Sequence, residues 1–61
     1  MEQRIITKFP DYTITEDGVI YDNNNNIVKT FINAAGYVSA ALNDRILTVA
    51  YLVAKTWLKN D

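Results

Sequence analysis

Cysteine and histidine are both missing from this 61-residue sequence. Their absence excludes a disulfide framework, a zinc or haem site built from these ligands, a cysteine nucleophile and a histidine acid or base. Most hydrolytic chemistry needs one of these groups, and so small a fold leaves little room for an active site. We therefore expect a protein that is not an enzyme, with no catalytic residues, no metal site and no cofactor.

A surplus of positive charge is also lacking. Six lysines and arginines stand against seven aspartates and glutamates, which gives a net charge of −1. Domains dedicated to nucleic acid usually carry a clear basic excess, because their cations displace counterions from phosphates. The charge balance thus predicts weak DNA binding at most, and the carboxylates are too sparse to imitate a phosphate backbone.

Long apolar runs are absent as well. No stretch approaches the roughly 18 residues of a membrane span, and residues 1–4 lack the apolar region of a signal peptide. We expect a cytoplasmic protein without membrane contacts. With 49% apolar and 21% charged residues the chain should fold, and its length limits it to a single domain over residues 1–61.

Alternating apolar residues and turn residues predict a series of β-hairpins. Tyr12–Tyr21 alternates around a turn in which Gly18 supplies a positive φ angle. The run Asn23–Asn26 predicts a second turn, and turn geometry explains these asparagines without the alternative role of contacting base edges. A third hairpin joins Tyr37–Leu42 to Arg45–Thr48.

The two ends of the chain follow different patterns. Near the start, Ile5–Thr7 predicts an edge strand that Pro10 ends. From Val49 onward the apolar residues recur at the spacing of an amphipathic helix of about ten residues, with Thr48 as the expected N-cap. The predicted apolar stripe consists of Ala50, Val53, Ala54, Trp57 and Leu58.

Together these patterns predict an α+β fold. A small antiparallel β-sheet of four to five hairpin strands precedes one C-terminal α-helix. Residues 9–32 form the β-hairpin region of the domain, and residues 36–60 form a strand-strand-helix region. Trp57 is expected to anchor the core rather than to stack on bases, because it lies on the apolar stripe.

Three segments resemble a known family in the same order. Phe9–Tyr21 is similar to the "[FY]-P-x-Y-x-I-S-x-x-G-x-V" opening of the nuclease-associated modular DNA-binding motif (NUMOD), which precedes phage HNH homing endonucleases. Gly36–Leu42 resembles its "N-x-x-G-Y-x-x-V-x-L" strand. Val49–Asn60 resembles the "V-H-R-L-V-A-x-A-F-[IL]-x-N" segment that begins the HNH core. The resemblance implies a DNA-binding module of phage type.

The chain departs from this family at the residue that carries catalysis. The histidine of the "V-H-R-L-V-A" segment is the general base in the family, and Ala50 occupies its position here. The later part of the HNH core would lie beyond Asp61. The resemblance therefore implies a degenerate, truncated derivative of such a nuclease without its activity.

Two kinds of contact surface follow from these observations. Lys29, Arg45, Lys55 and Lys59 are the candidates for binding nucleic acid, with Arg4 and Lys8 as further basic residues. The alternative is that these side chains form ordinary solvated faces. Tyr51 and Leu52 are the candidates for binding protein, since they extend the apolar arc of the helix.

The first hypothesis is a non-catalytic phage-type module that binds DNA. The alternative is a protein-binding phage inhibitor of a host or defence enzyme, which acts through the helix face in the host cytoplasm. We also expect a homodimer or a tight protein partner, because so small and apolar a chain cannot hide all its apolar surface alone. No small-molecule substrate is expected.

Overall fold

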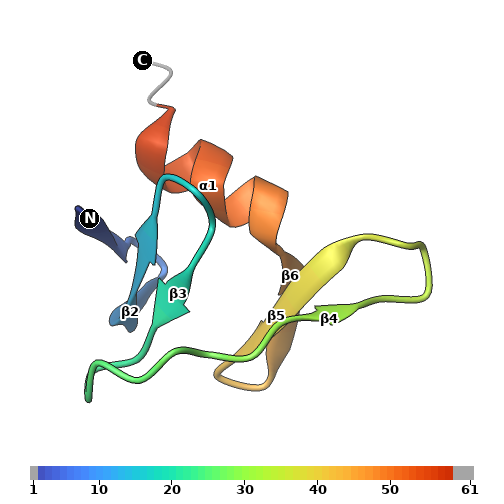
Figure 1. Cartoon of the computed structure of the whole chain (residues 1–61), viewed down its shortest axis with the longest axis horizontal. Helices are drawn as coiled ribbons and strands as arrows, with labels where there is room; N and C mark the ends of the chain where they lie inside the picture. Colours follow the sequence, from blue (N-terminus) through green and yellow to red (C-terminus); the bar gives the residue numbers. More distant parts are fainter. Residues whose placement is uncertain (1, 59–61) are drawn as a thin grey trace.

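The computed structural model describes residues 2–58, which form an α+β fold with one helix at the end (Figure 1). This part of the chain contains six strands, rather than the four to five predicted, in two antiparallel three-stranded sheets. The elements are β1 (Gln3–Ile6), β2 (Phe9–Thr15), β3 (Ile20–Tyr21), β4 (Phe31–Ile32), β5 (Val38–Leu42), β6 (Arg45–Thr48) and α1 (Val49–Trp57).

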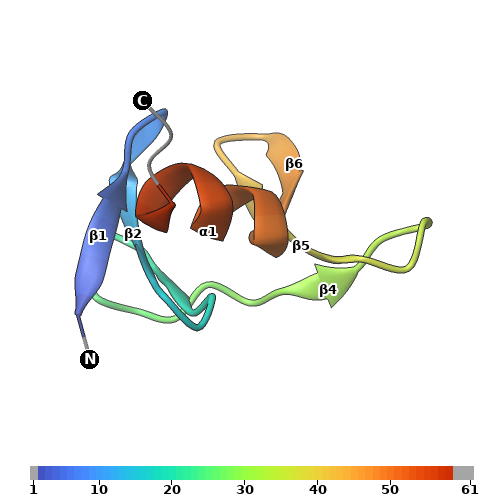
Figure 2. The ribbon, with the colours of Figure 1, turned by 90° about the horizontal axis from the view of Figure 1, so that it is seen from above.

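Both sheets follow the order of the chain. The first sheet has the order β1-β2-β3 and the second has the order β4-β5-β6, so that every strand pairs with its neighbour in sequence. The helix α1 lies between the two sheets and contacts β1, β2, β5 and β6 (Figure 2). The helix therefore packs against both sheets.

The first strand shows why Pro10 does not end the sheet. Gln3, Arg4 and Ile5 pair in register with Thr15, Ile14 and Thr13, and the register then shifts so that Ile6 lies opposite Phe9. The shift leaves residues 10–12 in a bulge of β2, where the missing N–H of proline costs no hydrogen bond of the ladder. The prediction that Pro10 ends a strand was wrong, and Pro10 lies inside β2.

Three loops share one hydrogen-bond pattern. They are Thr15–Val19, Asp22–Asn26 and Asn33–Tyr37. In each loop the N–H of the first residue donates to the carbonyl of the fifth, and the N–H of the fourth donates to the carbonyl of the first. In each loop a side-chain oxygen of the first residue also accepts the N–H of the fifth. A threonine, aspartate or asparagine at the first position thus closes each loop.

The fourth residue of each loop has a positive φ angle. Gly18 has φ 95°, Asn25 has φ 67° and Gly36 has φ 88°. This is the geometry of a type I turn followed by a left-handed residue, which glycine and asparagine adopt at the least steric cost. The predicted turns at Gly18 and at Asn23–Asn26 are confirmed.

The turn between β5 and β6 is of a different kind. Asn43 and Asp44 have φ angles of 51° and 68°, as a two-residue hairpin turn of type I′ requires. The predicted third hairpin and its tip are confirmed. The following helix is capped by Thr48, whose Oγ1 accepts the N–H of Tyr51 at 3.3 Å. The predicted N-cap is therefore also confirmed.

The hydrophobic core lies where α1 packs against the two sheets. On the helix it includes Leu52, of which 1% is exposed, while Ala50, Ala54 and Leu58 are exposed. The predicted stripe was therefore displaced by one residue, although Val53 and Trp57 do pack against the core. The buried apolar residues are Ile6, Phe9, Ile14, Ile20, Ala40, Leu42 and Leu52.

Candidate nucleic-acid interface

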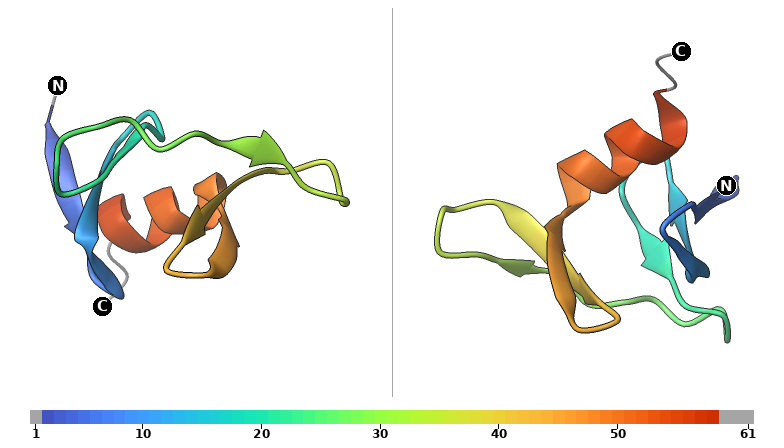
Figure 3. Two further views of the ribbon diagram at one scale, coloured as in Figure 1. Left: turned by 90° about the horizontal axis from the view of Figure 1, so that it is seen from below. Right: turned by 180° about the vertical axis from the view of Figure 1, so that it is seen from behind.

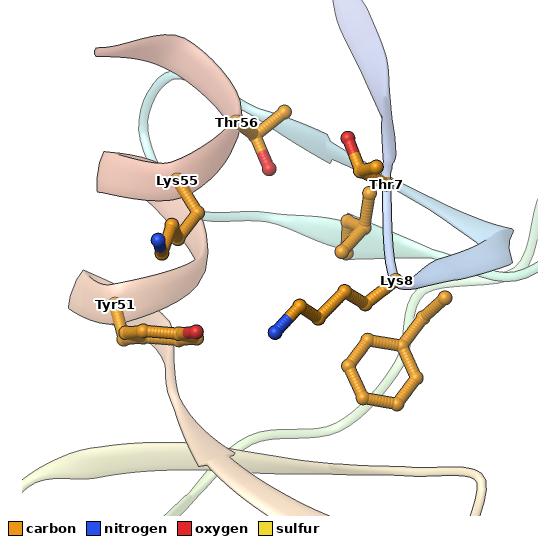
Figure 4. Close-up of a pocket in the computed structure, with 7 residues that line it drawn as sticks. Thr7, Lys8, Tyr51, Lys55 and Thr56 are labelled. Atoms are coloured by element: carbon orange, nitrogen blue, oxygen red, sulfur yellow. The ribbon is translucent and has the colours of Figure 1, made fainter. Parts of the chain in front are cut away.

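A small pocket lies between α1 and the turn that joins β1 to β2 (Figure 4). Its volume is about 250 Å³. The walls come from both elements and combine apolar, hydroxyl and ammonium groups. We call it the lysine pocket, and its lining residues are Ile6, Thr7, Lys8, Phe9, Tyr51, Lys55 and Thr56.

Two lysines reach this pocket from different elements. Lys8 lies in the two-residue turn after β1, and Lys55 lies on α1 one turn after Tyr51. Figure 4 shows the Lys8 side chain extending from the turn toward Tyr51 on the helix. The Lys55 Nζ lies 5.9 Å from the centre of the Tyr51 ring, at the outer limit of a cation–π contact. The fold thus gathers two positive charges around one aromatic ring.

Among residues 2–58, no carboxylate lines the lysine pocket. Within residues 2–58 the one ion pair joins the Arg4 Nε to the Glu2 carboxylate at 3.5 Å, and it leaves Lys8 and Lys55 without an acidic partner in that part of the chain. Two uncompensated ammonium groups in one hollow make a local positive field, although the whole chain carries −1. A local excess of positive charge therefore exists at the lysine pocket although the net charge of the chain is close to zero.

A third cation lies on the same pair of elements. The Arg4 guanidinium, from β1, stacks 4.2 Å above the ring of Trp57, from α1. The Trp57 side chain is half-buried, and it takes part in the core as predicted. Arg4, Lys8 and Lys55 therefore all lie where β1 and its following turn meet the helix.

The structure does not bring the four predicted nucleic-acid residues together. Lys55 lines the lysine pocket, and Lys59 lies outside the described residues. Arg45 follows the β5–β6 turn, which lies on the same side of α1 as the β1–β2 turn (Figures 2 and 3). Lys29 belongs to the segment between β3 and β4, which runs along the opposite side of α1. The cations on the lysine-pocket side of α1 therefore include Lys8 and Arg4, whereas Lys29 is not among them.

One of the two predicted protein-binding residues is misplaced. Tyr51 is 41% exposed and lines the lysine pocket. Leu52 is buried in the core, and the prediction that it lies on an exposed face was wrong. The helix turns by about 100° per residue, so the displacement of the stripe by one residue moves Leu52 from the surface to the interior.

The helix does expose apolar surface on another side. An open groove of about 820 Å³ runs between α1 and the segments around Gly18 and Tyr37. Ala50 and Ala54 supply part of its helix wall, and Val38 supplies part of the opposite wall. We call it the apolar groove, and its lining residues are Asp17, Gly18, Thr30, Tyr37, Val38, Thr48, Val49, Ala50, Val53, Ala54 and Leu58.

Ala50 lies exposed in the first turn of α1, and its methyl group carries no chemistry of its own. Among residues 2–58 there is no group of three or more acidic, histidine or cysteine side chains that would hold a metal ion. The same part of the chain has no helix of the length and apolarity that crossing a membrane requires.

Comparisons of this chain with protein-family models, with curated proteins and with solved structures find no match.

Proposed function

We propose that this chain is a small, non-catalytic module that binds DNA weakly in the cytoplasm of a host cell. The contact surface is the side of α1 that carries the lysine pocket. The observation that supports the proposal most is the convergence of Lys8 and Lys55, from two separate elements, on a hollow to which residues 2–58 contribute no carboxylate. Lysine and arginine neutralise backbone phosphates, which is the source of affinity that does not depend on sequence.

Aromatic side chains accompany these cations. Tyr51 lies beside Lys55, and Trp57 lies beneath Arg4. An exposed ring next to a cation is a common surface for nucleic-acid bases and sugars. The resemblance to the DNA-binding motif that precedes HNH endonucleases favours the same partner.

The size of the patch limits the affinity. Three cations neutralise two or three phosphates, so we expect the logarithm of the binding constant to fall with the logarithm of salt concentration with a slope of about −2 to −3. The dissociation constant should be no tighter than the non-specific range of about 10⁻⁴ to 10⁻⁶ M at physiological salt. Fluorescence anisotropy of a labelled duplex at several salt concentrations measures both quantities.

Matched lysine variants test the location. The double variant Lys8→Ala/Lys55→Ala should weaken duplex binding and reduce the salt slope by about 2, since each lysine accounts for about one phosphate contact. Lys29→Ala is the control, because Lys29 belongs to the segment between β3 and β4, which runs along the opposite side of α1. If Lys29→Ala loses half as much duplex-binding free energy as the double variant does, each lysine contributes equally wherever it lies, and this result would contradict the proposed surface.

A second candidate function is protein binding, which the apolar groove favours. Exposed apolar hollows of this kind are typical of contact surfaces. If the groove joins two copies of the chain, Ala54→Glu should abolish a concentration-dependent increase in mass in light scattering. Ile46→Glu is the control, since Ile46 is exposed outside the groove. Two results together would contradict protein binding and leave DNA as the partner. The chain would be a monomer at all concentrations, and nuclease treatment would remove every partner from a lysate pull-down.

A further inference from the structure

Three side-chain hydroxyls are buried in the described chain, and only two of them have partners. Thr15 accepts the N–H of Val19, and Ser39 donates to the carbonyl of Tyr37. Thr56 is only 7% exposed, and its Oγ1 forms no hydrogen bond within residues 2–58. Buried hydroxyls nearly always have a partner, so the exception calls for an explanation.

The position of Thr56 makes the missing bond more informative. A threonine inside a helix commonly donates to the carbonyl one turn earlier, which here is that of Leu52. Thr56 does not use this bond. Its hydroxyl points instead into the space between α1 and the β1–β2 turn (Figure 4). Oγ1 itself is covered by neighbouring atoms, so a partner that enters the lysine pocket reaches it only when side chains that line the pocket move aside.

The chemistry of the lysine pocket defines that partner. The ammonium groups of Lys8 and Lys55 only donate hydrogen bonds, and the hydroxyls of Thr56 and Tyr51 are able to donate. The described residues that line the pocket include no carboxylate to accept these bonds. The missing group is thus an acceptor of several hydrogen bonds that carries negative charge. A volume of about 250 Å³ suits one small group rather than a drug-sized molecule.

We infer that the lysine pocket binds a single phosphate group. The Thr56 hydroxyl donates to one phosphate oxygen, and Lys8 and Lys55 neutralise the charge from opposite walls. A phosphate offers several oxygens in different directions, which suits donors that come from two elements, and lysine binds it as a point charge. Phosphate binding by the pocket does not depend on the proposed DNA-binding function. Only the identification of this group as a phosphate of the DNA backbone rests on that function.

Inorganic phosphate is the direct probe. We expect a titration of the isotope-labelled full chain with sodium phosphate, at constant ionic strength against sodium chloride, to move the amide resonances of Thr7, Lys8, Lys55 and Thr56. Shifts of the same size at Lys29 and Arg45 would instead indicate general charge screening and would overturn the inference.

The isosteric variant Thr56→Val separates this site from simple attraction between charges. It removes the hydroxyl and keeps both lysines, so we expect phosphate to bind about tenfold more weakly. The thermal midpoint should stay the same or rise, because an unpaired buried hydroxyl is lost. Thr13→Val, at a threonine of β2 outside both the lysine pocket and the apolar groove, is the control and should bind phosphate like the parent chain. Unchanged phosphate affinity in Thr56→Val would overturn the inference.

Duplex DNA forms the second arm of the test. Proportional losses of phosphate and duplex affinity in Thr56→Val support a backbone phosphate in the pocket. Duplex binding that depends on Lys8 and Lys55 but not on Thr56, with no response of the pocket to phosphate, overturns the inference and leaves the proposed function intact. Phosphate binding to the pocket without any duplex binding supports the pocket for a free phosphate ester and contradicts the DNA function.

Discussion

The indole Nε1 of Trp57 donates a hydrogen bond to the main-chain carbonyl of Ile14 at 3.2 Å. Ile14 is fully buried in the central strand of the first sheet, and Trp57 is the last residue of α1. The same indole ring carries the Arg4 guanidinium on its face. Trp57 therefore joins the end of the helix to two adjacent strands, β1 and β2.

Replacement of Trp57 should cost more than its partial exposure suggests. We expect Trp57→Ala to lower the free energy of unfolding by about 3 kcal/mol, because it removes apolar contact and the bond to Ile14. Trp57→Phe keeps a ring beneath Arg4 but loses the N–H donor, so its loss should be about 1 kcal/mol. Urea titrations followed by far-UV circular dichroism measure both. Leu58→Ala, at a residue 66% exposed, is the control.

Leu52 should behave as a core residue and Tyr51 as a surface residue. We expect Leu52→Ala to cost about 2 to 5 kcal/mol, and Leu52→Asp to unfold the domain because it buries a charge. Tyr51→Ala, one position earlier, should leave the thermal midpoint within a few degrees of the parent chain. Similar midpoints for Leu52→Ala and Tyr51→Ala would show that the buried side of the helix is a different one.

The two glycines provide a matched pair for backbone strain. Gly18 and Gly36 both have positive φ angles, but a Cβ atom at Gly18 would lie 2.8 Å from Cγ1 of Val49, whereas a Cβ at Gly36 meets nothing within 4 Å. Gly36→Ala should therefore cost about 1 to 2 kcal/mol from the left-handed backbone alone. Gly18→Ala should cost about 2 to 4 kcal/mol, since overpacking adds to it. Thermal unfolding of both variants gives the difference, and equal losses would contradict the argument.

The chain should not cleave DNA. It contains no histidine to act as a general base. We expect supercoiled plasmid to stay intact with magnesium or manganese, in gel assays of the purified chain. Ala50→His should not change this result, because a lone imidazole has no acidic, histidine or cysteine cluster to work with in residues 2–58. Nicking by the parent chain that EDTA abolishes would contradict this prediction.

Local signals in the sequence predict the hairpins and the start of the helix well. Gly18, the asparagine run and Thr48 each act through hydrogen bonds to residues at most four positions away, so neighbouring residues suffice to recognise them. The loop Asn33–Tyr37 carries the same signal, a side-chain acceptor followed three residues later by glycine. That pairing of residues is therefore sufficient to predict a third loop of the same kind.

The buried side of the helix was not predictable in the same way. Residues 49–54 are six apolar residues in succession, so more than one stripe fits the helical period. The buried stripe includes the polar residue Thr56 and excludes the apolar residue Leu58, which is the reverse of what their polarity predicts. Only the positions of the sheets decide between the stripes, and those positions depend on pairings elsewhere in the chain.

The lysine pocket depends on contacts that sequence patterns do not reveal. Lys8 is recognisable as a turn residue only if β2 continues through Pro10, and the bulge that permits this is visible only in the strand register. Lys8 and Lys55 then line one pocket because α1 packs against β1. The candidate site is therefore a product of tertiary packing, whereas the fold class follows from local periodicity.

The pairing of strands only with their sequence neighbours has a consequence for the folding route. Each strand pair closes over a short stretch of chain, so its loop-closure entropy is small and each hairpin can form early. Neither small sheet is stable by itself without something packed on its apolar face. Because α1 contacts both sheets, we expect its docking to be the step that converts transient hairpins into a cooperative domain. Substitutions in the loops should alter mainly the hairpins, while substitutions on the buried side of α1 should determine whether the two halves unfold together.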